Sequence, residues 1–365
     1  MAFLIGKLFI FKINKNEMIS PRLAKSFIAA GIFLFIASCS KPNRSPGPGP
    51  GTGPVAHPNF SKGADISWLT QMEAGSRKFY NASGVEQECI TLLKSLGMNT
   101  IRLRVWVNPP GGWNNTADVV AKAVRAKNLG MRIMINFHYS DGWADPGQQT
   151  KPAAWAGQDI NGLKTLLSTH TSDVLNALKT SGVTPEWVQV GNETNNGMLW
   201  PEGRASTNMA NFTQLVNAGY DAVKAVFPSA KVIVHVSNGW DNSLFRWLYD
   251  GLKNNGGKWD VIGMSLYPTA GNWATLNAQC LTNMNDMIAR YAKEVMVVEV
   301  GMSWDQSTAC QSFLNDLISK TKSIAANKGL GVLYWEPQAY NNWQGYTLGA
   351  FDNLGKPTIA MNAFN

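Results

Sequence analysis

Two glutamates each occupy the end of a short apolar segment, where a carboxylate would sit at the carboxyl end of a buried strand. Glu193 ends the segment Trp187-Val-Gln-Val-Gly-Asn-Glu193, and Glu299 follows Val295-Met-Val-Val. Hydrolysis of a glycosidic bond needs an acid that protonates the leaving oxygen and a second carboxylate that attacks the sugar carbon or activates water. A structural ion pair is the alternative role for either residue. Asn192 favours catalysis, because its amide can hydrogen-bond a sugar hydroxyl beside the reacting carbon.

The segments that must position these glutamates alternate between apolar stretches and amphipathic stretches. Eight apolar stretches predict strands at residues 63–67, 100–106, 132–138, 187–193, 231–237, 261–267, 294–301 and 331–336. Their interiors are continuously apolar, which is typical of parallel strands buried on both faces. Helical spacing predicts helices at 85–96, 117–129 and 211–226, the first two ended by Gly97 and Gly130.

Eight strand–helix units over roughly 300 residues predict a single catalytic domain, residues 60–365, with the fold of a (β/α)8 barrel. A doubly wound open sheet is the alternative, but no Gly-x-Gly-x-x-Gly follows the first predicted strand. In a (β/α)8 barrel the active site forms at the carboxyl ends of the strands. Glu193 and Glu299 would then end the fourth and seventh strands, on opposite sides of the barrel mouth, and could face each other.

Tryptophan is unusually frequent, with 14 residues in the chain of 365. Nine of them lie at or after a predicted strand end, at positions 113, 143, 155, 200, 240, 273, 304, 335 and 343. Indole rings stack on the apolar faces of sugar rings, and their N–H groups donate hydrogen bonds. Packing within its own loop is an equally good account of any single tryptophan, but the set as a whole favours a carbohydrate cleft.

The N-terminal region has the features of an export signal. Residues 27–38 are apolar, too short for a comfortable membrane span, and preceded by Arg22 and Lys25. Small residues before Cys39 predict a lipoprotein signal peptide (1–38) with lipid on the Cys39 sulfur, and a Pro/Gly-rich tether (39–59) follows. We expect export and lipid anchoring to the bacterial cell envelope, at the outer membrane or cell surface. An ordinary secretory signal is the alternative.

The overall charge excludes some classes of partner. The net charge is +8, and half of it lies in residues 1–38. The remainder is only mildly basic and has no block of Lys and Arg interleaved with aromatic residues, so we expect no nucleic-acid partner. We expect a monomer that acts on a polysaccharide.

Several long motifs resemble glycoside hydrolase family 53, the arabinogalactan endo-β-1,4-galactanases of clan A, across most of residues 62–360. The motifs are Lys62-Gly-Ala-Asp-Ile-Ser-Trp68, Ile101-Arg-Leu-Arg-Val-Trp106, Phe137-His-Tyr-Ser-Asp141, Trp143-Ala-Asp-Pro146, Gln149-Thr-Lys-Pro152, Val190-Gly-Asn-Glu-Thr-Asn195, Asn238-Gly-Trp-Asp241, Met264-Ser-Leu-Tyr-Pro268 and Val298-Glu-Val-Gly301. The resemblance implies a retaining endo-hydrolase of β-1,4-galactan, the galactose side chains of pectin. A related clan A hydrolase of mannan, xylan or cellulose is one alternative, and a surface glycan-binding lipoprotein is another.

The resemblance also implies a role for each site residue. Glu193 becomes the acid/base and Glu299 the nucleophile, with Tyr267 donating a hydrogen bond to Glu299 and Trp335 forming the floor under the cleaved sugar. Either Arg102 or Arg104 would keep the nucleophile ionised. The residues expected to hydrogen-bond sugar hydroxyls are Asp65, His138, Asp141, Asp145 and His235.

We expect no cofactor and no metal. Some members of the family bind calcium after the seventh strand, but residues 301–308 are a short loop with one acid, Asp305. In the oxidising exterior, Cys280 and Cys310 follow neighbouring strands and could form a disulfide bond, although free thiols are as good an expectation. Cys89 lies among apolar residues and is predicted to be part of the core.

Overall fold

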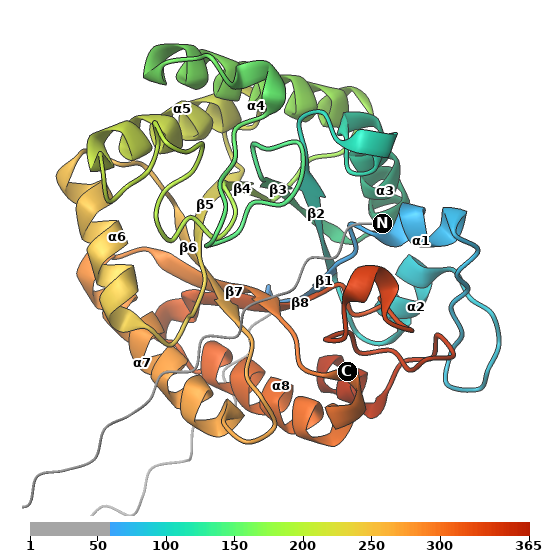
Figure 1. The fold of residues 1–365 in the computed structure, drawn as a ribbon. Helices are drawn as coiled ribbons and strands as arrows, with labels where there is room; N and C mark the ends of the chain where they lie inside the picture. The colour runs from blue at the N-terminus through green and yellow to red at the C-terminus, as the bar shows by residue number, and fades with distance from the viewer. Residues whose placement is uncertain (1–58) are drawn as a thin grey trace, which may run out of the picture. The chain divides into compact units, whose positions relative to one another are not determined.

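The predicted strands all form, and they close into a barrel whose strands run parallel to their neighbours. In the computed structural model, which describes residues 59–365, each strand pairs with the next and β8 pairs with β1 (Figure 1). The strands are β1 (Ser61–Asp65), β2 (Thr100–Val105), β3 (Arg132–Phe137), β4 (Trp187–Val190), β5 (Lys231–Val236), β6 (Val261–Leu266), β7 (Glu294–Val300) and β8 (Gly329–Trp335). This topology confirms the predicted (β/α)8 barrel.

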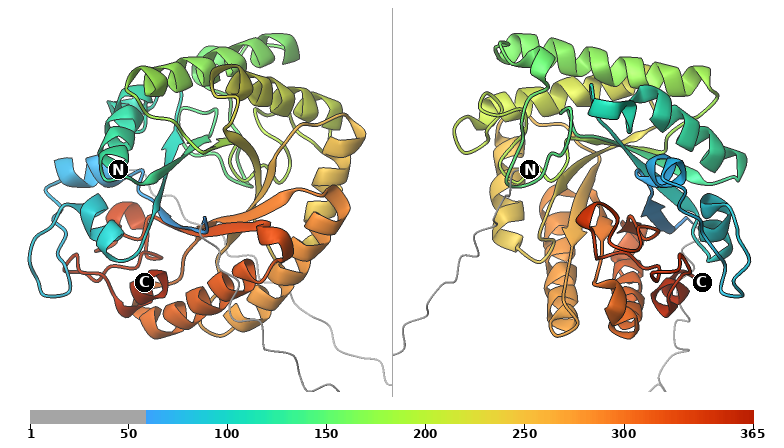
Figure 2. Two further views of the ribbon diagram at one scale, coloured as in Figure 1. Left: turned by 180° about the vertical axis from the view of Figure 1, so that it is seen from behind. Right: turned by 45° about the vertical axis from the view of Figure 1, so that its right-hand side comes forward.

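Helices form a ring around the barrel, as the views in Figures 1 and 2 show. The α-helices are α1 (Leu69–Ala74), α2 (Cys89–Ser95), α3 (Thr116–Asn128), α4 (Ile160–Thr180), α5 (Met209–Val226), α6 (Asn242–Asn254), α7 (Trp273–Tyr291) and α8 (Ser307–Lys322). Short 3₁₀ helices are η1 (Pro110–Gly112), η2 (Ala153–Trp155), η3 (Trp304–Gln306), η4 (Ala325–Asn327), η5 (Trp343–Gly345) and η6 (Ile359–Phe364). Both α1 and α2 follow β1, and no α-helix follows β8 in the described residues. There η6 occupies the position of the outer helix and packs against α8.

Capping residues set the ends of two predicted helices. α3 begins after Asn115, whose side chain accepts a hydrogen bond from the Asp118 backbone N–H, and Gly130 beyond its end has the predicted left-handed conformation (φ 71°). The helix predicted at 85–96 is shorter than expected. Glu88 caps α2 by accepting a hydrogen bond from the Thr91 backbone N–H, so residues 85–88 lie outside the helix.

Every strand ends one to three residues before its predicted end, and two of these ends are followed by a glutamate with a positive φ. β4 ends at Val190, so Glu193 lies beyond the strand with a positive φ of 43°. Glu336 follows β8 in the same way, with a φ of 50°. A positive φ is uncommon for a residue with a Cβ atom and is often found where the backbone serves a functional site. Glu299, in contrast, lies within β7.

The interior of the barrel is divided into an apolar part and a polar part. The side chains of Met134, Trp187, Ile233, Val261, Met296, Val298 and Leu333 pack together inside the barrel. Most of them precede the carboxyl ends of their strands, so they close the amino-terminal half of the interior. The carboxyl-terminal half holds buried polar residues instead, including Arg102, Arg104 and Gln189. Buried polar side chains need hydrogen-bond partners, and in this layer they find them in one another. The layer lies directly beneath the candidate active site.

Of the two expectations for Cys280 and Cys310, the structure shows free thiols and no disulfide bond. Both residues are free and buried, as is Cys89. Cys280, in α7, lies against Gly239, whereas the Cys310 sulfur in α8 lies 3.7 Å from the Tyr334 hydroxyl. Each thiol therefore packs under its own helix instead of reaching across to the other. The prediction that Cys89 belongs to the core is confirmed.

The predicted signal peptide at 1–38, the lipidation site Cys39 and all of the 39–59 tether except Asn59 lie outside the described residues. Within residues 59–365, no helix has the length and apolar character needed to cross a membrane.

Candidate active site

Glu193 and Glu299 face each other across a cavity at the carboxyl ends of the strands. A carboxylate oxygen of Glu193 and one of Glu299 lie within 4.8 Å of each other. The cavity has a volume of about 290 Å³ and is lined by His138, Trp143, Ala144, Asp145, Asn192, Glu193, Tyr267, Glu299, Trp335, Tyr346 and Leu348. The tertiary structure therefore brings together two carboxylates that are separated by more than a hundred residues in the sequence.

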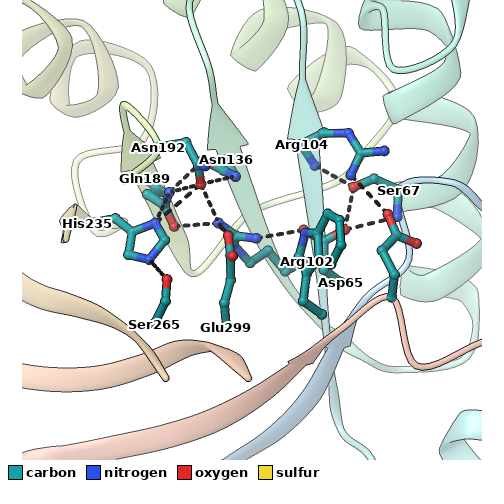
Figure 3. Close-up of polar contacts among 12 residues, drawn as sticks. Asp65, Ser67, Arg102, Arg104, Asn136, Gln189, Asn192, His235, Ser265 and Glu299 are labelled. Carbon is teal, nitrogen blue, oxygen red and sulfur yellow. Dashed lines mark hydrogen bonds and ion pairs between the residues drawn. The ribbon is translucent and has the colours of Figure 1, made fainter. Parts of the chain in front are cut away.

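Glu299 is held by two hydrogen-bond donors, one on each oxygen. An Arg102 guanidinium nitrogen lies 2.7 Å from Oε1, and the Tyr267 hydroxyl donates to Oε2 at 3.0 Å. Burial raises the pKa of Glu299, and the positive charge of Arg102 opposes this rise. Of the two arginines on β2, Arg102 is therefore the one beside this carboxylate, as Figure 3 shows.

Three further side-chain oxygen atoms in the barrel accept hydrogen bonds from Arg102 and fix its guanidinium group. It pairs with Asp65 at 2.7 Å and donates to Gln189 Oε1 at 3.0 Å and Asn192 Oδ1 at 3.1 Å. Asp65 is fully buried and also accepts hydrogen bonds from Ser67. The expectation that Asp65 contacts a sugar is wrong, because its carboxylate is used inside the barrel to orient Arg102.

Arg104 is the arginine of β2 that does not pair with Glu299. It forms a fully buried ion pair with Glu336 at 2.9 Å. Its guanidinium also lies over the ring of Trp143, 4.5 Å from the ring centre, and close to the rings of Trp68 and Trp106. Arg104 thus supports the aromatic wall of the site from behind.

Glu193 differs from Glu299 in its surroundings, and this gives it a different protonation state. The Ser265 hydroxyl donates to Glu193 Oε1 at 2.7 Å, and no arginine contacts this carboxyl group among the described residues. Burial and the negative charge of Glu299 raise the pKa of Glu193 to about 8. Glu193 is therefore protonated near neutral pH, while Arg102 favours the ionised form of Glu299. Such a difference allows one member of a carboxyl pair to act as an acid while the other stays ionised.

His138 lines the cavity as a neutral hydrogen-bond donor. Its Nδ1 accepts hydrogen bonds from Trp106 Nε1 and from the Ala144 backbone N–H, both at 3.3 Å. Burial and the charges of Arg104 and Arg102 lower the pKa of His138 well below its usual value. The ring proton is consequently on Nε2, which leaves this nitrogen as a hydrogen-bond donor.

His235 does not line the cavity, in contrast to its expected sugar contact. It is fully buried, and its two ring nitrogens lie within hydrogen-bond distance of Gln189 and Ser265. Asn192 lines the cavity, but its amide group already has protein partners, with Nδ2 donating to the Ala144 carbonyl at 2.9 Å.

The two aspartates of the loop after β3 serve different purposes. Asp141 accepts hydrogen bonds from the backbone N–H groups of Asn108 and Ala153 and does not line the cavity between the two glutamates. Asp145 does line the cavity, although its carboxylate accepts hydrogen bonds from the backbone N–H groups of Gly147 and Gln148.

The predicted tryptophan surface is smaller than expected and partly different in membership. Of the nine residues, Trp143 and Trp335 line the cavity. A second hollow of about 360 Å³ shares Trp143 and Tyr346 with the cavity and is lined also by Trp68, Gln71, Trp106, Pro110, Trp113, Gln344 and Gly345. Trp155, in contrast, is buried against His170. The rings of Trp68, Trp106, Trp143, Trp335 and Tyr346 contact one another and form a continuous aromatic wall.

Glu336, Gln189 and Ser265 belong to this network but are not among the residues predicted from the sequence. Glu336 follows an apolar strand in the same pattern as Glu193, so the same criterion would have found it. Burial raises the pKa of Glu336 to about 8, and Arg104 opposes that rise. Gln189 is a polar residue in the middle of an apolar strand, which is also a usable signal. A single serine such as Ser265 carries no comparable signal.

Comparison with known proteins agrees with this geometry. The model of the family described as Glycosyl hydrolase family 53 matches residues 61–364. An arabinogalactan endo-beta-1,4-galactanase of Thermothelomyces thermophilus is 34% identical over 302 residues, covering 77% of this chain and 90% of the relative. A protein of the same description from Humicola insolens is also 34% identical over 302 residues, with the same coverage of both chains.

Solved structures give the same result. A chain from a study of two fungal beta-1,4-galactanases superposes with a TM-score of 0.77 at 31% identity, covering 83% of this chain and 98% of the other. The GH53 catalytic domain of Ignisphaera aggregans superposes with a TM-score of 0.77 at 29% identity. The match covers 86% of this chain and 97% of that domain. The chain therefore belongs to glycosyl hydrolase family 53.

Proposed function

We propose that the protein is a retaining endo-β-1,4-galactanase. The observation that carries the mechanism is the short separation of the two carboxyl groups, whose oxygens lie within 4.8 Å. Retaining glycosidases hold their carboxyl groups about 5–5.5 Å apart, and inverting enzymes need about 6.5–9.5 Å to place a water molecule between them. The substrate class is supported by family membership and by the relatives described as galactanases.

In the first step, Glu193 donates its proton to the glycosidic oxygen while a Glu299 oxygen attacks the anomeric carbon. The bond to the leaving sugar breaks, and a covalent glycosyl–enzyme forms on Glu299. In the second step, the ionised Glu193 takes a proton from water, whose oxygen displaces Glu299 from the same carbon. The acidity of Glu193 and the ionic partner of Glu299 suit these two roles.

The walls of the cavity suit a sugar ring. Trp143 and Trp335 offer indole faces for stacking on the C–H groups of a pyranose. His138 offers an N–H donor, since its Nδ1 is occupied by protein donors. Binding of one sugar by stacking and by a neutral donor leaves the two carboxyl groups free for the reaction.

The experiment that tests the proposal compares linear β-1,4-galactan with β-1,4-mannan, xylan and a cellulose oligomer. We expect a rapid fall in galactan chain length and no comparable cleavage of the other three. Proton NMR of the first products should show the β-anomer before mutarotation. An initial α-anomer would refute retention, and equal activity on mannan or xylan would refute the substrate assignment. Galactan binding without cleavage would indicate a binding protein.

We also propose that the protein is exported as a monomer and anchored by lipid on Cys39. The proposal rests on the sequence of residues 1–59. Replacing Cys39 by serine should move the protein from the membrane fraction to the soluble fraction of a bacterial host. A mass spectrum of the wild-type N-terminal peptide that lacks a lipid adduct would contradict the anchor.

A further inference from the structure

We propose that Ser265 and His235 are positioning residues that fix which oxygen of Glu193 carries the transferable proton. A chain of directional hydrogen bonds leads from Arg102 through Gln189, His235 and Ser265 to Glu193 Oε1, and Figure 3 shows most of its members. The direction of each bond follows from groups that can only donate or only accept. The catalytic consequence rests on the proposed function, but the direction of the hydrogen bonds does not.

The first link is the orientation of the Gln189 amide. Arg102 Nη2 can only donate, and it lies 3.0 Å from Gln189 Oε1. At the other end, Gln189 Nε2 lies 2.9 Å from the Gly191 carbonyl oxygen, which can only accept. These two contacts leave one orientation of the amide. The Gln189 amide nitrogen, which also lies 2.6 Å from Asn136 Oδ1, therefore faces His235 Nδ1 at 3.0 Å.

The second link is the tautomer of His235. Besides Gln189, the backbone N–H of Glu193 points at His235 Nδ1 at 3.3 Å. Asn192 Oδ1 also lies 3.2 Å from this nitrogen, but that oxygen already accepts hydrogen bonds from Arg102 and Asn136. The Glu193 backbone N–H can only donate and is directed at Nδ1, so Nδ1 is the acceptor and the ring proton is on Nε2.

The third link transfers this direction to Ser265. His235 Nε2 lies 2.6 Å from Ser265 Oγ, so its N–H donates to that oxygen. The Ser265 hydroxyl hydrogen is then directed at Glu193 Oε1, at 2.7 Å. Burial and the charge of Arg102 lower the pKa of His235 well below its usual value, so the ring stays neutral and the direction persists across the working pH range.

The consequence concerns the two oxygens of Glu193. Because Oε1 accepts from Ser265 in both protonation states, the acidic proton must sit on Oε2. The same serine stabilises the ionised form, in which Glu193 acts as the base of the second step. The other charged or titratable groups that face Glu193 are Glu299 from β7, Arg102 from β2, Tyr267 from β6 and Asp145 from the loop after β3, together with His235 from β5.

The first test determines the tautomer without any activity measurement. The full chain would be labelled with ¹⁵N in its histidine rings, and the two nitrogen shifts of His235 measured from pH 5 to pH 8. A His235→Gln variant identifies the signal. We expect a neutral ring with the proton on Nε2 throughout. A proton on Nδ1, or a charged ring within this range, would overturn the proposal even if the protein proves to be a galactanase.

The second test uses the pH profile of kcat/KM on galactan. Removing the Ser265 hydroxyl deprives ionised Glu193 of a hydrogen bond and raises its pKa, so Ser265→Ala should retain activity to higher pH, by about one pH unit. The acidic side of the profile, which reports Glu299, should stay in place. Ser265→Thr keeps a hydroxyl and should keep the wild-type profile. An unchanged alkaline side in Ser265→Ala would overturn the proposal.

A matched control removes a hydroxyl from the neighbouring strand end. Ser237 follows β5, is buried, and accepts a hydrogen bond from Asn195 Nδ2 at 2.6 Å without contacting either glutamate. Ser237→Ala should leave both sides of the profile unchanged. A wild-type protein that does not cleave galactan would refute the proposed function alone. The tautomer of His235 can still be read from its ¹⁵N shifts, and the pKa of Glu193 from NMR of ¹³C-labelled carboxyl groups.

Discussion

Replacing Glu193 by glutamine separates its role as an acid from its role in the structure. The amide has nearly the same shape, and its oxygen can still accept the hydrogen bond from Ser265. The change also removes a carboxyl group that lies within 4.8 Å of Glu299 in a buried site, so no new unpaired charge is created. We therefore expect the free energy of unfolding to change by less than about 1 kcal/mol.

The effect on the rate should be large and should depend on the leaving group. General acid–base catalysis contributes about 10²- to 10⁴-fold, which corresponds to about 3–5 kcal/mol of activation free energy. Glu193→Gln should lose this factor on galactan, whose sugar leaving group needs a proton. On a galactobioside with a dinitrophenolate leaving group, which needs no proton, the first step should remain fast. The glycosyl–enzyme on Glu299 should then accumulate, because the base of the second step is missing.

The assay has three parts that together exclude a general loss of structure. Reducing-sugar release gives kcat on galactan, stopped-flow absorbance gives the burst of dinitrophenolate, and added azide should restore turnover by forming a β-glycosyl azide. The control is Glu202→Gln, because Glu202 pairs with Lys151 and does not line the cavity. Near-normal galactan cleavage by Glu193→Gln, or equal losses on both substrates without azide rescue, would refute the assignment of the acid.

Three further outcomes are expected. Arg102→Met leaves the buried Glu299 carboxylate without its counter-ion, so the free energy of unfolding in urea should fall by about 3–5 kcal/mol, and a loss below about 1 kcal/mol would contradict the account of this ion pair. Because Glu193 must be protonated in the first step and its pKa is raised to about 8, wild-type kcat/KM should decline as pH rises through about 8, and a decline already complete at pH 6 would be inconsistent with that role. Trp335→Ala, made in the Glu193→Gln background, should weaken galacto-oligosaccharide binding by about 1–2 kcal/mol in calorimetry through lost stacking, and unchanged affinity would place the sugar elsewhere.

The fold was largely accessible from the sequence because the apolar strands are separated by helical patterns of ordinary length. Errors occurred mainly at the ends of elements. The predicted strand at 187–193 stops at Val190, since the chain turns out of the sheet at Gly191, whose φ is 81°, and Glu193 also has a positive φ. At residues 85–88 the Glu88 side chain caps the helix and shortens it, a local competition that periodicity cannot detect.

The pair of glutamates was also accessible, because each follows an apolar strand and the topology of a barrel brings strands four and seven together. The choice between Arg102 and Arg104 was not. Both point into the barrel by the alternation of a strand, and only their different heights decide that one meets Glu299 and the other Glu336. Asp65 likewise has the right residue type for binding a sugar but lies too deep, paired with Arg102.

Residue types and spacing thus determined the barrel and the two reacting carboxyl groups, because hydrophobic periodicity and strand order are properties of the chain itself. The tertiary structure alone decided the protonation of the pair. Acidity depends on burial and on which charges and hydroxyls stand within a few ångströms, and Ser265, Arg102 and Tyr267 reach the glutamates from other strands. It also decided the fate of the cysteines, because two thiols can bond only where their helices turn them toward each other.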